Sequence, residues 1–138
     1  MPAETSDDDL IDALGQTAFT TMGALTGLAA DAGLSLTQLR VLAILRDRRL
    51  RMSDLAEYLG LEKSTMTGLV ARAERKELLA RVANEQDARA VDVVLTDQGR
   101  AVADALGLAL REALLPFTAR LPVADRRALT DLLRRMLP

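Results

Sequence analysis

The chain has 138 residues, 49% of them hydrophobic, and a formal net charge of −2 at neutral pH. This length fits one domain with a buried core. It has no cysteine and no histidine, which excludes disulfides, thiol chemistry, histidine-based catalysis and zinc sites that need these ligands.

The charge is divided unevenly along the chain. Residues 1–39 carry six acidic and no basic side chains, whereas residues 40–90 carry eleven basic and eight acidic ones. Phosphate binding requires a local basic surface, whatever the total charge. On charge alone, however, a solvated arginine-rich surface is the simpler interpretation of the middle of the chain.

Neither a membrane span nor an export signal is predicted. No apolar run approaches the roughly 18 residues of a transmembrane helix. The stretch 1–9 is acidic where a signal peptide would be basic. We therefore expect a cytoplasmic protein that makes no membrane contact.

Capping signals mark the first two predicted helices. Ser6 is a suitable N-cap, the three aspartates after it suit the positive end of a helix, and Gly33 is a suitable stop. A second helix starts at Ser35, which has Gln38 at the spacing of a capping box, and ends near Arg46.

A charged turn and a short third helix follow. The string Arg46–Arg51 is predicted as the turn. Ser53 is the expected N-cap of the third helix, and Gly60 is its expected end. A fourth helix is predicted from Lys63.

The fourth helix has two contrasting faces. Met66, Leu69, Val70 and Ala73 have the i, i+3, i+4, i+7 spacing of a buried stripe. The opposite face is small, polar and basic. A short helix, a tight turn with glycine and a second helix with such a face are typical of a helix-turn-helix.

The pattern then becomes extended. Residues 78–82 and 90–95 are predicted as strands, joined by a polar turn over residues 84–89. Two strands directly after a helix-turn-helix form a β-wing. The predicted fold class is therefore mainly α with a small β-wing (α+β).

Two helices complete the chain. The fifth is predicted from Asp97 to Leu115, where Pro116 marks a break. Pro122 suits the first turn of the sixth helix, whose apolar residues recur at helical spacing.

Three stretches follow one another in a definite order. They are residues 36–42, residues 53–70, and Asp87-Ala88-Arg89 with the strand and Gly99 behind it. In this order and spacing they resemble the MarR family of winged helix-turn-helix transcriptional regulators. The resemblance covers nearly the whole chain.

The resemblance implies a homodimer on double-stranded DNA with a pseudo-palindromic operator. In the single domain 1–138, residues 35–95 would form the DNA-binding winged helix-turn-helix, and residues 6–33 and 97–138 the dimerisation helices. A monomeric bundle of the terminal helices is the alternative. The expected dimerisation residues are Leu10, Leu14, Leu129, Leu132, Leu133 and Met136.

The resemblance also implies which residues contact DNA. Short hydroxyl side chains and a glycine would let the fourth helix approach the major groove closely. Arg89 resembles the wing arginine that reaches the minor groove. Asp87 is expected to support the wing by holding Arg89 or Arg72, since phosphates would repel it. The expected DNA-binding residues are Lys63, Ser64, Thr65, Thr67, Gly68, Arg72 and Arg89.

Some positions depart from the family pattern. Glu77 stands where the family usually has a glycine, and Gly68 stands where a larger polar residue often reads a base. Arg51 and Arg75 are further phosphate candidates, for which a solvated face is an equal explanation.

Family members commonly bind small, often aromatic or anionic ligands between the dimer helices and the winged domain. Such a ligand would relieve repression by a population shift. For the pocket residues, core packing is the alternative. The candidates are Met22, Leu25, Leu39, Leu42, Tyr58 and Leu106.

The predicted function is sequence-specific regulation of transcription, as a repressor, without a cofactor, metal or catalytic residue. The alternative is a winged-helix module that binds protein, which the acidic first 39 residues and Gly68 leave open. An enzyme is not predicted, because helix capping explains the only acidic cluster, which comprises Asp7, Asp8, Asp9 and Asp12.

Overall fold

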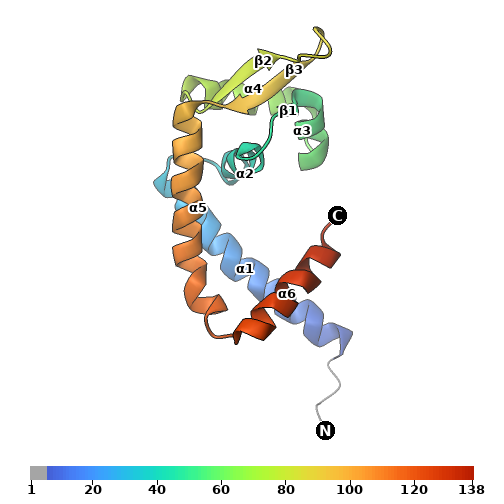
Figure 1. Cartoon of the computed structure of the whole chain (residues 1–138), viewed down its shortest axis with the longest axis vertical. Helices are drawn as coiled ribbons and strands as arrows, with labels where there is room; N and C mark the ends of the chain where they lie inside the picture. Colours follow the sequence, from blue (N-terminus) through green and yellow to red (C-terminus); the bar gives the residue numbers. More distant parts are fainter. Residues whose placement is uncertain (1–5) are drawn as a thin grey trace. The chain divides into compact units, whose positions relative to one another are not determined.

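A computed structural model describes residues 6–138 (Figure 1). The stretch 1–5, which belongs to the acidic N-terminus compared above with a signal peptide, lies outside the described residues. The elements follow the order α1, α2, β1, α3, α4, β2, β3, α5, α6. This confirms a mainly helical fold with a small antiparallel sheet.

The chain forms two compact units. One combines the N-terminal segment up to Leu25 with Ala109–Pro138, and the other is Thr26–Leu108. The helices α1 (Asp7–Asp31) and α5 (Asp97–Thr118) each contribute residues to both units. The helix-turn-helix and the sheet therefore lie within the second unit.

Aliphatic side chains from α2 (Leu36–Leu45), α3 (Met52–Leu59), α4 (Lys63–Arg75) and the sheet form the core of the second unit. Burying each large side chain of this kind contributes about 1.5–3 kcal/mol. The four apolar positions predicted for the fourth helix are all buried. The largest fully buried side chains are Leu42, Leu45, Leu55, Met66, Val41, Val70 and Val93.

The structure confirms the predicted caps that depend only on neighbouring residues in the sequence. Ser6 Oγ accepts a hydrogen bond of 3.1 Å from the backbone N–H of Asp9 at the start of α1. Ser35 and Gln38 form both halves of a capping box at the start of α2. Gly60 ends α3 with a φ of 66°, a conformation that suits glycine.

A short strand lies where a charged turn was predicted. β1 (Leu50–Arg51) pairs antiparallel with the later strand, placing Arg51 opposite Asp92. The extended backbone of Arg51 makes it the N-cap of α3, which begins at Met52. The predicted cap at Ser53 is therefore wrong, because a long-range strand pairing sets the entry into this helix.

The predicted break between the last two helices is shifted. α5 continues through Pro116 to Thr118 instead of ending at Leu115, since a proline in the last turn removes only one backbone donor. Pro122 is the N-cap of α6 (Val123–Met136) and lies one residue before its first turn.

The sheet has the strand order β1, β3, β2. β2 (Leu79–Ala83) and β3 (Val91–Leu95) form an antiparallel hairpin, within one residue of the predicted strands. Figure 1 shows the hairpin ending in the loop that joins these strands. This loop, residues 84–90, is called the wing loop below.

The first unit leaves large apolar side chains uncovered. No residue of α6 is buried. Leu10 on α1 and Leu129, Leu132, Leu133 and Met136 on α6 expose between 41% and 56% of their surface. Single exposed leucines are ordinary on a protein surface, whereas this unit exposes five large apolar side chains on two helices.

No single helix within residues 6–138 has both the length and the hydropathy to cross a membrane. The pair α1 and α2, which is bent by 91°, passes the same test by length and composition only.

Candidate nucleic-acid interface

The predicted recognition helix α4 carries its polar face on the surface. The hydroxyl of Thr67 donates a hydrogen bond of 2.8 Å to the carbonyl oxygen of Lys63. The N-cap residue Glu62 makes no side-chain capping bond, so it does not satisfy the first N–H groups of the helix. The exposed predicted residues on this helix are Lys63, Ser64, Thr65, Thr67 and Arg72, and Gly68 is partly exposed.

A hollow of about 340 Å³ lies between α4 and the wing. Arg51, Lys63, Arg81 and Arg89 contribute four cationic groups to its lining, and Asp87 contributes a carboxylate. We call it the basic hollow. Cations gathered in one concave surface attract phosphate groups.

The predicted DNA-binding residues divide between two places. Lys63, Thr67 and Arg89 line the basic hollow, whereas Ser64, Thr65, Gly68 and Arg72 lie elsewhere on α4. A Cβ atom at Gly68 would meet the guanidinium of Arg72 at 3.5 Å, which is an ordinary contact.

Arg81 was not predicted as a functional residue. Its position in a predicted strand did not indicate that it would pair with Glu74. Its Nε lies 2.7 Å from Glu74 Oε1 on α4. This ion pair connects β2 to α4 and neutralises part of the charge that Arg81 brings to the hollow.

Side-chain oxygens hold the wing loop. Asn84 Oδ1 accepts hydrogen bonds of 2.9 Å from the backbone N–H groups of both Gln86 and Asp87. Asp87 Oδ1 accepts one of 3.0 Å from the backbone N–H of Arg89. The other oxygen of Asp87 lies 4.0 Å from Arg51 Nη1. The described contacts of Asp87 are thus with the backbone of Arg89 and the side chain of Arg51, not with Arg72.

Behind the loop, Asp92 on β3 is a buried carboxylate with both oxygens bonded. Its Oδ1 accepts a hydrogen bond of 2.9 Å from Asn84 Nδ2, and its Oδ2 accepts one of 2.9 Å from Arg49 Nε. The Asn84 bond, followed by the bond and charge of Arg49, lowers the pKa of Asp92 below 3.8 despite the opposing effect of burial.

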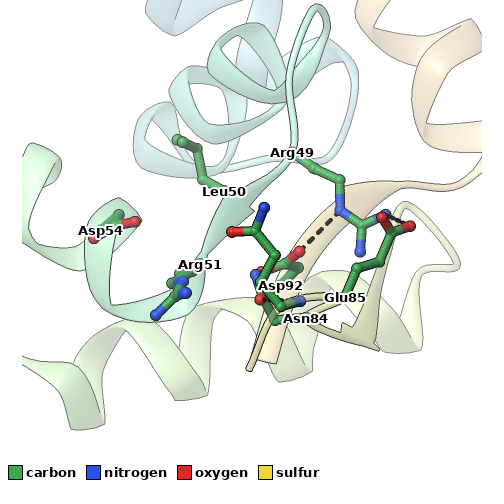
Figure 2. Close-up of a pocket in the computed structure, with 8 residues that line it drawn as sticks. Arg49, Leu50, Arg51, Asp54, Asn84, Glu85 and Asp92 are labelled. Atoms are coloured by element: carbon green, nitrogen blue, oxygen red, sulfur yellow. Dashed lines mark hydrogen bonds and ion pairs between the residues drawn. The ribbon is translucent and has the colours of Figure 1, made fainter. Parts of the chain in front are cut away.

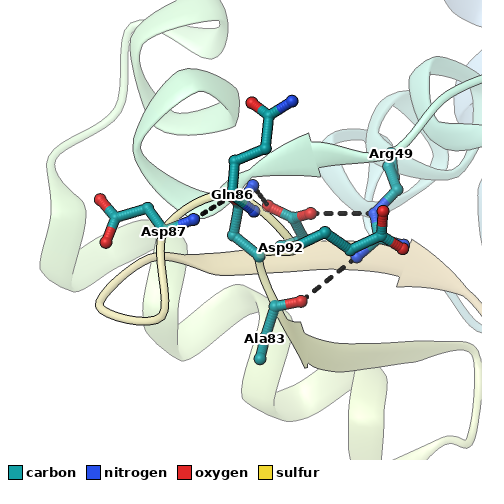
Figure 3. A network of polar contacts seen from close by, with 7 residues as sticks. Arg49, Ala83, Gln86, Asp87 and Asp92 are labelled. Carbon is teal, nitrogen blue, oxygen red and sulfur yellow. Dashed lines mark hydrogen bonds and ion pairs between the residues drawn. The ribbon is translucent and has the colours of Figure 1, made fainter.

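Arg49 reaches further contacts with its other nitrogens. Its Nη2 donates to the carbonyl oxygen of Ala83 at 3.4 Å, and its Nη1 lies 3.7 Å from Glu85 Oε1. Figure 3 shows Arg49 directed at both Asp92 and Ala83. Figure 2 shows that Arg49 and Asp92 also border a second hollow, of about 280 Å³.

Arg49, Asn84 and Asp92 were not predicted as functional residues. The sequence held one indication of a special role for Asp92, because this carboxylate stands between two valines in a predicted strand. A carboxylate buried in a strand needs a partner, but the sequence does not name it.

A family model described as the MarR family matches residues 32–90, the segment that contains α2, α3, α4 and most of the wing. Over this segment, the chain is similar to the MarR family. The HTH-type transcriptional repressor MdtR of Bacillus subtilis is 40% identical over 68 residues, which cover 49% of this chain and 44% of MdtR. The match thus spans less than half of this curated relative.

Solved structures extend the MarR fold to nearly the whole chain. NadR, in complex with 4-hydroxyphenylacetate, has a TM-score of 0.78 at 23% identity and covers 99% of this chain and 97% of its own. A mutant E. coli MarR complexed with operator DNA has a TM-score of 0.68 at 22% identity, with 96% and 99% covered. These likenesses confirm the winged-helix fold.

In this MarR fold, the end of α4 is tied to the start of α5. Glu77, where the family usually has glycine, has a φ of 60°, and Leu78 N–H donates to Ala73 O at 3.0 Å to close the helix. The hydroxyl of Thr96 donates to the carbonyl oxygen of Glu77 and accepts a bond of 2.9 Å from Gly99 N–H. The residue that follows the C-cap of α4 is therefore bonded to Thr96, which caps the start of α5.

The residues predicted for a MarR ligand pocket have differing surroundings. Leu39 and Leu42 are buried in the core of the second unit, whereas Tyr58 is 62% exposed under the guanidinium of Arg40. Met22, Leu25 and Leu106 are exposed to differing degrees, and none of the six lines the two hollows described above. The pocket stays a prediction.

No metal site is formed by acidic side chains within the described range 6–138.

Proposed function

We propose that the chain is a homodimeric, sequence-specific DNA-binding regulator of transcription that acts as a repressor. The basic hollow between α4 and the wing carries this proposal, because it gathers cationic groups from both elements. MdtR is named a transcriptional repressor, and a structural neighbour was solved with operator DNA. Both agree with this role.

In the proposed complex, α4 lies in the major groove. Its small polar side chains read base edges and phosphates, and Arg89 enters the minor groove. Arg51 and Arg81 at the basic hollow contribute phosphate contacts. The residues proposed to contact DNA from α4 are Lys63, Ser64, Thr65, Thr67, Gly68 and Arg72.

The uncovered apolar residues of the first unit support a homodimer. An amphipathic helix of 14 residues with no buried position gains little stability by itself. A second copy of the chain would cover these side chains and present two recognition helices to half-sites about one DNA turn apart. The residues proposed for this interface are Leu10, Leu14, Leu129, Leu132, Leu133 and Met136.

We also propose that a small molecule relieves repression. The complex of NadR with 4-hydroxyphenylacetate supports a ligand of that size in this fold. A ligand that prefers a dimer with mismatched half-site spacing would shift the population away from DNA. The residues proposed for its pocket remain Met22, Leu25, Leu39, Leu42, Tyr58 and Leu106.

The DNA-binding proposal is tested with fluorescence anisotropy and a selection from a randomised duplex library. We expect the selection to enrich a pseudo-palindromic motif. The enriched duplex should bind more tightly than a scrambled one, with an affinity that falls steeply as salt is raised. A library that yields no motif, together with equal binding to both duplexes, would contradict sequence-specific regulation.

Two single arginine variants, one in the wing and one control, make this test more specific. Arg89→Ala should weaken binding of the enriched duplex by about tenfold or more. Arg48 is exposed and does not line the basic hollow, so Arg48→Ala should have a much smaller effect. Equal losses in both variants would indicate a diffuse charge effect instead of a wing contact.

A further inference from the structure

We propose that Arg49, which lies outside the wing loop, positions the wing arginine Arg89 for DNA through a continuous line of contacts. Arg49 would thus be a positioning residue in the DNA binding proposed above, on which this inference rests. The line runs from Arg49 through Asp92 and Asn84 to the backbone of the loop and then through Asp87 to Arg89.

The first link crosses the sheet. Arg49 directly precedes β1, yet its Nε bonds Asp92 on the central strand β3 at 2.9 Å and its Nη2 bonds the carbonyl of Ala83 at the end of β2 at 3.4 Å. One guanidinium therefore joins the entry of β1 to both strands of the hairpin (Figure 3).

The second link is Asn84, which connects Asp92 to the backbone of the wing loop. Asp92 accepts from Asn84 Nδ2, which orients the amide so that its oxygen faces the loop. That oxygen accepts the N–H groups of Gln86 and Asp87, both at 2.9 Å. Two successive backbone groups of the loop thus depend on the orientation of one side chain.

The third link reaches the arginine. Asp87 Oδ1 accepts the backbone N–H of Arg89 at 3.0 Å, and the loop closes with Asn84 N–H donating to Ala90 O at 3.1 Å. These bonds fix the backbone from which the Arg89 side chain extends. Arg89 itself lines the basic hollow.

All three guanidinium nitrogens of Arg49 face partners on the β2–β3 hairpin and its loop. Nε and Nη2 make the bonds described above, and Nη1 lies 3.7 Å from the carboxylate of Glu85. Arg49 does not line the basic hollow. Its charge is therefore matched by carboxylates rather than offered to phosphate, which separates its role from that of Arg89.

The test compares DNA affinities of the full chain by fluorescence anisotropy with the enriched duplex. Arg49→Met removes the guanidinium and keeps an apolar stem. Asn84→Ala breaks the same line at a second point and leaves the Arg49–Asp92 pair in place, which covers the case in which Arg49→Met fails to fold. Arg48→Met is the matched control, because it removes the same charge from the neighbouring residue.

We expect Arg49→Met and Asn84→Ala each to weaken binding by about tenfold. Arg48→Met should change it by no more than about twofold, since it removes only a solvated charge. In an Arg89→Ala background, neither of the first two variants should weaken binding by more than about twofold, because residues that act through one another are not additive. If the losses of binding free energy in Arg49→Met and Arg89→Ala added fully, and Arg49→Met reduced the slope of log affinity against log salt concentration by about one, Arg49 would contact a phosphate directly. That result would overturn the proposal.

A second readout needs no DNA. The amide ¹⁵N–¹H signals of Gln86, Asp87 and Arg89 should shift in Arg49→Met and Asn84→Ala and stay in place in Arg48→Met. Unchanged wing signals in a folded Arg49→Met protein would overturn the proposal even if DNA binding is weakened. If instead the wild-type chain bound no specific DNA while these signals shifted as expected, the proposed function would fail and the positioning of the loop would stand.

Discussion

The α-carbon of Gly99 packs directly against the backbone of Leu78, and a Cβ atom at position 99 would overlap with the carbonyl oxygen of Leu78. This contact brings the first turn of α5 against the residue before β2. Because the obstacle is backbone, it cannot rotate away as a flexible side chain could.

Gly99→Ala is therefore expected to destabilise the protein by about 3 kcal/mol, the upper end of the usual range for overpacking. Urea unfolding followed by circular dichroism measures the change. Gly107→Ala is the control in the same helix. A Cβ there would lie 2.9 Å from the movable end of Arg46, so a much smaller change is expected. Equal losses at both positions would contradict the backbone contact.

A second prediction concerns the left-handed residue at the end of α4. Glu77 has a φ of 60°, where a side chain costs about 1–2 kcal/mol. Glu77→Gly should raise the free energy of unfolding by about 0.5–1 kcal/mol, after allowing for the greater chain entropy of glycine. Glu77→Gln keeps the Cβ and removes the charge, so it should leave stability unchanged. A matching rise in the glutamine variant would assign the effect to charge.

A third prediction separates stability from DNA affinity. Gly68→Ala fills a helix position with space for a methyl group, so the free energy of unfolding should rise by about 0.5–1 kcal/mol. In the proposed complex the same methyl group would stand between α4 and the major groove, so affinity for the enriched duplex should fall by about tenfold. Thermal unfolding and anisotropy on one preparation provide both values. A stabilised variant with undiminished affinity would place Gly68 away from DNA.

A fourth prediction follows from the lowered pKa of Asp92. The folded-state pKa lies below the ordinary value of 3.8, so protonation favours the unfolded chain. The contribution of Asp92 is fully present above 3.8 and is lost as the pH falls through the folded-state pKa. Between neutral pH and about pH 3, stability should therefore fall more steeply for the wild type than for Asp92→Asn. Parallel curves from urea unfolding would contradict the assigned pKa.

A fifth prediction tests the dimer. Leu132→Glu places a charge on a half-exposed apolar position of α6 and should raise the dimer dissociation constant by at least about tenfold. Light scattering during gel filtration measures the mass as the protein is diluted. Thr130→Glu introduces the same charge on the same helix at an exposed polar residue and should leave the dimer intact. A monomeric wild type would refute the proposed interface.

The sequence predicted the elements whose causes are local. The capping box of Ser35 and Gln38 and the glycine stop at Gly60 depend on neighbours within a few residues, and both are present in the structure. The buried stripe of α4 follows from helical periodicity alone. Such features need no knowledge of the rest of the fold.

The features that were missed depend on partners far along the chain. β1 has two residues and exists because β3 pairs with it. Arg49 and Asp92 are 43 positions apart, and no spacing rule connects them. Of the candidate site, the residues on α4 and in the wing were predicted from the family resemblance, whereas the network that holds the wing required three-dimensional proximity.

The two lysines of the chain, Lys63 and Lys76, are the first residue and the C-cap of α4. Lys76 Nζ is bonded to the carbonyl oxygen of Gly33, whereas Lys63 lines the basic hollow. Reagents that acylate side-chain amines therefore mark the two ends of α4 and no other helix. Shielding of Lys63 by a duplex would be a chemical footprint of the end of α4 that is proposed to face DNA, with Lys76 as the internal standard.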